Sequence, residues 1–263
     1  MAGRVSLYFL LGCCLLALLA FVLPLSPNTI SLDKILVTPE PSAWFGYDEL
    51  GRPILSRVLA GASVSFTVAV AVVLISATVG TLIGTVSAFI GGRLDLLTGL
   101  ITDIFLAFPG ILLAIALAAI LGPGINNIII ALSLVGWTGY ARLARTQTLS
   151  LMQRDHIAAA RSLGSGLPRM VFRHLLPLMA APLIVEATFG IASVIIAEAG
   201  LSFLGLGVQP PEPSWGSMIR EGVRYLLVAP HLVIIPGSLL FMVVFAVNIL
   251  GDALRDRLDV RQH

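Results

Sequence analysis

The stretch Asp155-His-Ile-Ala-Ala-Ala-Arg-Ser-Leu-Gly164, which runs on to Arg173-His-Leu-Leu-Pro177, is a polar, arginine-rich loop between long apolar segments. Hydrophobic residues make up 57% of the 263-residue chain and charged residues only 11%, far from the balance of a water-soluble domain. So much apolar surface cannot be buried in one soluble core, and the bilayer must be its solvent. The sequence therefore predicts an all-α polytopic membrane protein.

Six apolar segments are long enough to be spans, because about 20 residues are needed to cross the hydrocarbon as a helix. They lie at residues 6–24, 62–90, 96–121, 125–141, 178–204 and 231–251, separated by polar stretches at 25–61, 91–95, 122–124, 142–177 and 205–230. We expect three parts: a first span with an external segment (1–61), a five-helix core containing the loop 142–177 (62–255), and a short cytoplasmic tail (256–263).

Basic residues are distributed unequally between the two sides of this arrangement. The side that holds both termini carries eleven arginines, and the opposite side carries Lys34 and four arginines. Because cytoplasmic loops are enriched in Lys and Arg, both termini and residues 142–177 are predicted to face the cytoplasm.

The first 61 residues are predicted to contain a span, an irregular connection and a short helix. Arg4 followed by apolar residues up to Leu23 also fits a signal peptide, whose cleavage would leave five spans; we favour an uncleaved first span. Prolines after it predict an irregular external connection. The apolar period that follows Gly51 predicts a short amphipathic helix along the outer interface.

The loop 142–177 is predicted to form two short helices joined by a glycine. Residues 142–163 have a helical pattern that ends at Gly164, where a left-handed conformation is least costly for glycine. Ser165 is expected to cap a second helix near Pro168, which ends where Pro177 opens the next span. The result would be a compact knob. From the residues alone, a docking surface and a basic loop that only fixes topology are equally compatible with this pattern.

This loop resembles the EAA loop of ABC-importer permeases, in which Glu-Ala-Ala is followed by three residues, Gly, nine residues and Ile-x-Leu-Pro. The matching positions here are Ala159, Ala160, Gly164, Leu176 and Pro177. Ala158 replaces the Glu and His174 replaces the Ile, and both departures are similar to the dipeptide, oligopeptide and nickel branch. Residues 46–57 and 198–216 resemble two further segments of these permeases, in the same order along the chain.

The resemblance implies a type I permease subunit that is not itself an enzyme. In that family the loop docks a separate ATPase, and the residues implied for this coupling are Ala159, Ala160, Arg161, Gly164, Leu176 and Pro177. The implied partners are a second homologous permease subunit, two ABC ATPase subunits, an extracytoplasmic binding protein and membrane lipid. ATP and Mg would be bound by the ATPases, because the single lysine, Lys34, has no Walker A glycines before it.

Three carboxylates, Asp103, Glu186 and Glu198, lie within predicted spans, where an ionisable residue is a functional hypothesis by default. They could line the translocation path or hold helices in one gate state. Alternatively, each lies near an interface or bonds to a neighbouring helix, and Arg142 or Arg145 are possible partners for Asp103. Glu186 lies deepest and is the best candidate for a group that faces a cavity.

The remaining alternatives concern the cargo and the energy source. Peptides are expected as cargo because the resembling branch mostly carries them, and nickel stays open. An ion-coupled secondary transporter is the competing class, although the inverted repeats and interrupted helices it predicts are not evident. No metal site is predicted, because Cys13 and Cys14 are adjacent in an apolar run, and a net charge of +2 does not suggest nucleic acid.

Overall fold

The computed structural model describes residues 26–41 and 43–259. The predicted first span at 6–24, the signal-peptide alternative and the last four residues lie outside the described residues. The part described is helical and contains no β-strand, only two isolated bridges in the segment 26–53. An all-α fold is thus confirmed for the residues that the structure describes.

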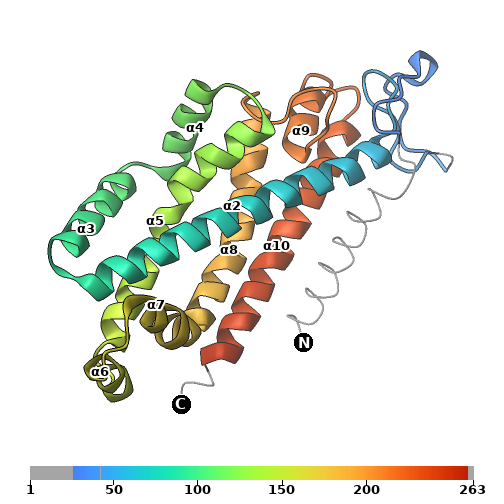
Figure 1. Ribbon diagram of the computed structural model, residues 1–263. Helices are drawn as coiled ribbons and strands as arrows, with labels where there is room; N and C mark the ends of the chain where they lie inside the picture. Colours follow the sequence, from blue (N-terminus) through green and yellow to red (C-terminus); the bar gives the residue numbers. More distant parts are fainter. Residues whose placement is uncertain (1–25, 42, 260–263) are drawn as a thin grey trace.

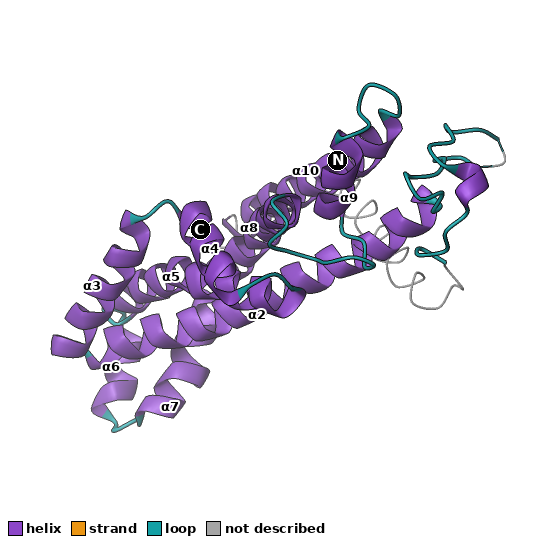
Figure 2. Ribbon diagram, turned by 90° about the horizontal axis from the view of Figure 1, so that it is seen from above, coloured by secondary structure: helices purple, strands orange, loops and turns teal. Residues whose placement is uncertain are grey.

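Four long helices form a bundle (Figures 1 and 2). Each is long and apolar enough to cross a membrane, and a bent helix pair would make a fifth span among the described residues. The long helices are α2 (Ile54–Ile90), α5 (Ile125–Leu151), α8 (Leu176–Phe203) and α10 (His231–Asp259). The shorter elements are η1 (Leu32–Lys34), α3 (Gly92–Ala107), α4 (Gly110–Leu121), α6 (Asp155–Ser162), α7 (Leu167–Arg169), η2 (Met170–Leu175) and α9 (Trp215–Val223).

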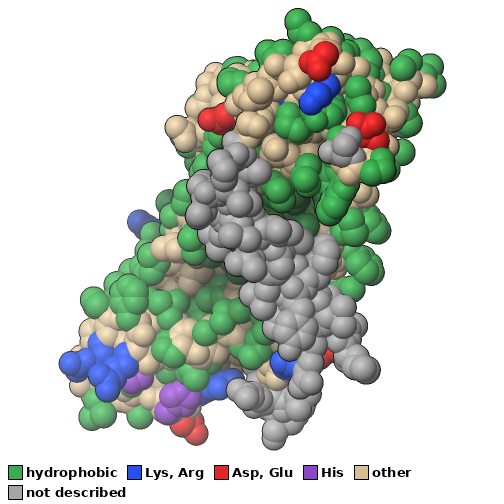
Figure 3. All heavy atoms as spheres, turned by 90° about the vertical axis from the view of Figure 1, so that its right-hand side faces the viewer, with side chains coloured by type: hydrophobic (Ala, Val, Ile, Leu, Met, Phe, Trp, Pro, Cys, Tyr) green, Lys and Arg blue, Asp and Glu red, His purple; other side chains and the backbone are tan. Residues whose placement is uncertain are grey.

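The two ends of the bundle differ in character. The segment 26–53 and α9 lie at one end, and α6 and α7 lie at the other in both ribbon views (Figures 1 and 2). In the space-filling view, Lys, Arg and His side chains gather at the α6 end, and hydrophobic side chains cover much of the surface between the ends (Figure 3). This is the distribution expected of a chain whose middle faces lipid or other membrane helices.

The prediction of a separate interfacial helix after Gly51 is wrong. Residues 54–61 are the first two turns of α2, which continues without a break to Ile90. Ile54 and Val58 are buried against α9 and α10, and the charged side chain of Arg57 is only 1% exposed. The apolar spacing of residues 54–61 therefore reflects packing of α2 against α9 and α10 rather than contact with a membrane interface.

The predicted single span 96–121 is broken into α3 and α4, whose axes differ by 89°. Phe108 has an extended backbone (φ −94°, ψ 141°) and Pro109 precedes the first residue of α4. A proline disfavours the helical region for the residue before it and cannot donate a helical hydrogen bond. The sequence pattern missed this break because hydropathy does not change across it.

Small residues allow α2 and α5 to pack with their backbones in contact. A Cβ atom on Gly80 would collide with the carbonyl of Trp137, and one on Gly84 would collide with the carbonyl of Ala141. Glycines four residues apart give one flat helix face for this approach. The Gly80–Gly84 pattern thus serves packing within the chain.

The loop 142–177 differs from its predicted helices at three points. The predicted helix 142–163 is divided, because α5 continues to Leu151 and α6 begins at Asp155. Ser165 caps no helix, since α7 begins at Leu167 after Gly166. Pro177 does not separate two helices either: residues 167–203 form one helix with a π-helical turn, η2, before the proline.

The π-helical turn gives a physical reason for this continuity. The backbone N–H of Leu176 donates to the carbonyl of Val171, five residues earlier. In a regular α-helix the ring of Pro177 would clash with the carbonyl four residues before it, whereas a wider turn leaves more room. The second helix of the loop and the following span are therefore one continuous helix.

Candidate functional site

The turn after α6 is a Schellman motif. Gly164 has φ +79°, its N–H donates to the carbonyl of Arg161 (3.0 Å), and the N–H of Ser165 donates to the carbonyl of Ala160 (3.2 Å). These are the two hydrogen bonds that define the motif, in which the residue with positive φ is most often glycine. The motif ends α6 and turns the chain back toward α7.

A small apolar core fixes α6 to the base of the bundle. Ile157 is 2% exposed and packs with Met170, Leu175 and Met179 from the helix that becomes α8, and with Leu151 at the end of α5. Burying a side chain of this size stabilises the contact by about 1.5–3 kcal/mol. The knob formed by residues 155–173 is therefore attached to α5 and α8 by packing as well as by the chain.

The outer surface of the knob combines apolar and basic side chains. Leu163 is 87% exposed and Phe172 is 64% exposed. Leu163 lies at the end of α6, whereas Phe172 lines a groove with residues of α2 and α8. The exposed basic residues of the same segment are Arg154, Arg161, Arg169 and Arg173. A large exposed apolar side chain in an otherwise charged segment is typical of an interaction surface.

The residues implied for coupling fall into two groups. Ala160 and Leu176 are half-buried against the core of the knob, so their role is to hold it together. Ala159 and Pro177 are exposed, and the guanidinium of Arg161 lies over the ring of Phe89 at 5.4 Å. Gly164 shapes the turn.

Sequence reasoning missed Leu163 and Phe172 as surface residues. Their only signal is that they are large and apolar in an otherwise polar loop. Hydropathy alone would have placed Leu163 and Phe172 in the core, because it does not show which side of a short helix packs against the rest of the protein.

Two ion pairs join α3 to α5. Asp103 accepts a hydrogen bond from Arg142 (2.7 Å), one of its two expected partners, and both side chains are exposed. Two turns away, Arg145 binds Asp95 through two hydrogen bonds of 2.6 and 2.7 Å. A bidentate pair of this kind is more specific than a single contact. The structure therefore gives Asp103 a role in fastening α3.

Glu198 is fully buried where α2, α8 and the start of α9 meet. Its Oε2 accepts a hydrogen bond from the hydroxyl of Ser65 and its Oε1 from that of Ser202, both at 2.7 Å. The Ser202 oxygen also accepts the N–H of Val208 (3.2 Å). Glu198 thus joins α2 to α8 and to the connection before α9. Nothing in sequence spacing reveals Ser65, which is 133 positions away.

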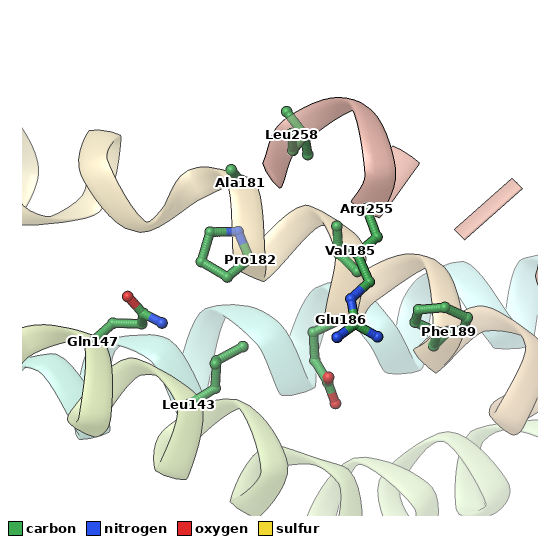
Figure 4. A pocket seen from close by; sticks show the side chains of 9 residues that line it. All are labelled: Leu143, Gln147, Ala181, Pro182, Val185, Glu186, Phe189, Arg255 and Leu258. Carbon is green, nitrogen blue, oxygen red and sulfur yellow. The ribbon is translucent and has the colours of Figure 1, made fainter. Parts of the chain in front are cut away.

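Glu186 is exposed and lines a cavity of about 410 Å³ between α5, α8 and α10 (Figure 4). Its Oε1 points toward α5, where a Cβ on Gly139 would lie 3.8 Å away. Arg255 reaches into the same cavity from α10. The other lining residues are Leu143, Gln147, Ala181, Pro182, Val185, Phe189 and Leu258. Asp103 also lines a cavity, of about 370 Å³ between α3 and α5, where it is paired with Arg142, whereas Glu198 is fully buried.

A cluster of ion pairs lies at the opposite end of the bundle. Asp48 accepts a hydrogen bond from Arg52 (2.6 Å) and forms an ion pair with Arg57 (3.2 Å), and Glu221 of α9 accepts hydrogen bonds from the same two arginines at 3.2 and 2.9 Å. Glu49 pairs with Arg52 at 2.8 Å. Burial raises the pKa of Glu49 above its usual range, although the Arg52 guanidinium acts in the opposite direction. This cluster ties the segment 26–53 to α2 and α9.

The backbone fold is similar to that of solved importer permeases. A chain from an inward-facing crystal form of the MetNI methionine ABC transporter superposes with a TM-score of 0.64, covering 78% of this chain and 98% of that chain at 17% identity. A second crystal form gives 0.60 at 20% identity, covering 84% and 99%. This likeness concerns the fold and confirms the type I permease architecture.

The sequence comparisons agree with the fold. The chain is 44% identical over 232 residues to the glutathione transport system permease protein GsiD of Escherichia coli O1:K1 / APEC, covering 88% of this chain and 77% of that protein. GsiD of Shigella boydii serotype 4 matches with the same identity and coverage. Residues 80–262 match the model of the binding-protein-dependent transport system inner membrane component. The chain therefore belongs to this family, as a non-enzymatic permease subunit of an ABC importer in the dipeptide and oligopeptide branch.

Proposed function

We propose that this chain forms part of the pathway by which an ATP-driven importer takes up di- or oligopeptides delivered by an extracytoplasmic binding protein. It pairs with a second, homologous permease subunit and with two ATPase subunits. ATP binding brings the ATPases together, the docked knob moves with them, and the pathway switches from inward-facing to outward-facing. An energy source in an ion gradient does not fit the family to which the chain belongs.

The continuity between the knob and α8 is the observation that carries this proposal. Residues 167–203 form one helix, and Ile157 anchors α6 to its first turns. A displacement of the knob is therefore passed to a membrane span through a continuous helix, which contains the π-helical turn and Pro182. The Schellman turn at Gly164 keeps α6 at a fixed angle to this helix.

The exposed surface of the knob supports a docking role. Leu163 supplies an exposed apolar anchor, and the exposed arginines of the same segment suit a partner groove with an acidic rim. Central apolar contacts with a charged rim are the usual anatomy of a protein interface. The basic residues at this end also support a cytoplasmic position for the knob and both termini.

Peptides are preferred over nickel as the cargo. The relatives that share 44% identity with this chain are named for glutathione, a tripeptide. The cargo is tested by purifying the transporter with its binding protein and measuring the mass of the ligand that the binding protein carries. A peptide mass supports the proposal, and a nickel ion or nickel chelate as the bound species contradicts it.

The docking role is tested by replacing one exposed anchor. Leu163→Asp is expected to abolish co-purification of the ATPase, because it places a carboxylate in the apolar centre of the contact. Leu227→Asp is the matched control, since Leu227 is fully exposed but lies in the connection between α9 and α10 at the far end of the bundle. Retention of the ATPase by the Leu163→Asp variant would contradict docking at this surface.

A further inference from the structure

The cavity between α5, α8 and α10 carries opposite charges on two of its walls. Glu186 comes from α8 and Arg255 from α10, while Gln147 adds an uncharged polar group from α5 (Figure 4). A volume of about 410 Å³ lies within the range of small-molecule sites. The cavity is therefore large enough to hold a small polar ligand.

The two charges lie at similar depth. Gly251 of α10 packs against Phe189 of α8, since a Cβ on Gly251 would lie 2.9 Å from that ring. The two helices run antiparallel. The residue four positions after Gly251 on α10 therefore lies at the level of the residue four positions before Phe189 on α8. Arg255 is thus level with Val185 and Glu186, roughly 15 Å along α8 from its first residue at a rise of 1.5 Å per residue.

Glu186 faces this cavity as an exposed carboxylate. A carboxylate inside a span is unfavourable unless it faces water, a cation or a hydrogen-bond donor. Glu186 and Arg255 line the same cavity of about 410 Å³. The cavity therefore offers a ligand both an anionic and a cationic side chain.

We infer that Glu186 and Arg255 form a binding site for a zwitterionic peptide on its way through the permease. This inference rests on the proposed function. The ammonium group of the peptide faces the Glu186 carboxylate, and its carboxylate faces the Arg255 guanidinium, which has five N–H donors and can serve more than one acceptor. The site selects by charge at both ends of the ligand and leaves the side chains to the apolar walls.

Protection of a reporter cysteine tests binding directly. The reporter is Gln147→Cys in a variant whose native cysteines are replaced (Cys13→Ser, Cys14→Ser), within the complete transporter in inside-out vesicles. Glycylglycine, a zwitterion, is expected to slow maleimide labelling about threefold at twice its dissociation constant, following 1 + [L]/Kd. N-acetylglycinamide, which has no charge, is expected to have no effect. A Ser193→Cys reporter, in the crevice between α4, α5 and α8, serves as the control and should not be protected.

Glu186 is then changed in the reporter background. Glu186→Gln should abolish protection by glycylglycine, and Glu186→Asp should retain part of it, which shows that the variants are folded. Equal protection by the neutral probe, no protection at all, or protection that survives Glu186→Gln would overturn the inference. Peptide uptake by the unmodified complex is measured separately, so loss of this site leaves the proposed function standing if uptake depends on ATP and the binding protein.

Discussion

Replacing Gly164 by valine tests whether the fixed angle of the knob couples the ATPase to the membrane spans. Gly164 has φ +79°, a conformation that a β-branched residue strongly disfavours. A Cβ at this position would meet no atom within 4 Å. The effect therefore comes from backbone strain at the turn, and the apolar core of the bundle is not disturbed.

The size of the effect follows from the backbone. Left-handed conformation costs an ordinary L-residue about 1–2 kcal/mol and a strained site about 1–3 kcal/mol, so about 2 kcal/mol is expected for valine. Since 1.4 kcal/mol is a factor of ten, the native turn becomes about 30-fold less favoured relative to alternatives. We expect α6 to leave its native angle while residues 167–203 stay inserted.

The assay compares peptide uptake with ATP hydrolysis in proteoliposomes that contain the complete transporter. Gly164→Val should lower the amount of peptide imported per ATP by about tenfold or more, in line with the strain at the turn. Gly166→Val is the matched control, because Gly166 has φ −67° and also faces open space. Normal coupling in the Gly164→Val variant, or equal loss in the control, would refute the reasoning.

Three further predictions concern stability. Glu198→Ala should lower stability by about 2–3 kcal/mol, because two buried hydroxyls lose their acceptor, and thermal unfolding in detergent measures this against the exposed control Glu212→Ala. Gly84→Leu should prevent correct folding through collision with the α5 backbone, whereas Gly99→Leu meets no atom and should elute normally in size-exclusion chromatography. Burial raises the pKa of Glu49. The contribution of Glu49 to the stability of the segment 26–53 is therefore fully present below its ordinary pKa of 4.5 and is lost as the pH rises through the higher pKa of the folded state. Hydrogen-exchange protection of this segment, corrected for intrinsic rates, should therefore fall as the pH rises above about 4.5, and Glu49→Gln should show a smaller fall.

Long apolar runs predicted the bundle well because hydropathy measures the preference for lipid directly. The spans predicted at 62–90, 125–141, 178–204 and 231–251 coincide with α2, α5, α8 and α10. The break between α3 and α4 was missed, although Pro109 was visible, because apolar character continues across it. Helix boundaries in the loop 142–177 were also misplaced, since α5 extends beyond its apolar part and the helix that contains Pro177 continues through a π-helical turn.

The residues of the candidate sites also divide into those that the sequence identifies and those that only the structure identifies. Gly164 could be identified from the chain, because a helix end that needs a positive φ favours glycine whatever surrounds it. The link from Glu198 to Ser65 could not, because it depends on which helices become neighbours. Glu186 could be named as an unusual charge in a span, but only the structure places it across a cavity from Arg255.

The sequence by itself determined that this protein lies in a membrane, that its loop 142–177 turns at Gly164, and that its motifs resemble those of importer permeases. These properties are local, because composition, hydropathy and turn chemistry act within a few residues. Tertiary structure decided which face of the knob is exposed, that its second helix is continuous with α8, and which carboxylates line cavities. Those outcomes depend on contacts between residues far apart in the chain, and each is fixed only when the helices pack together.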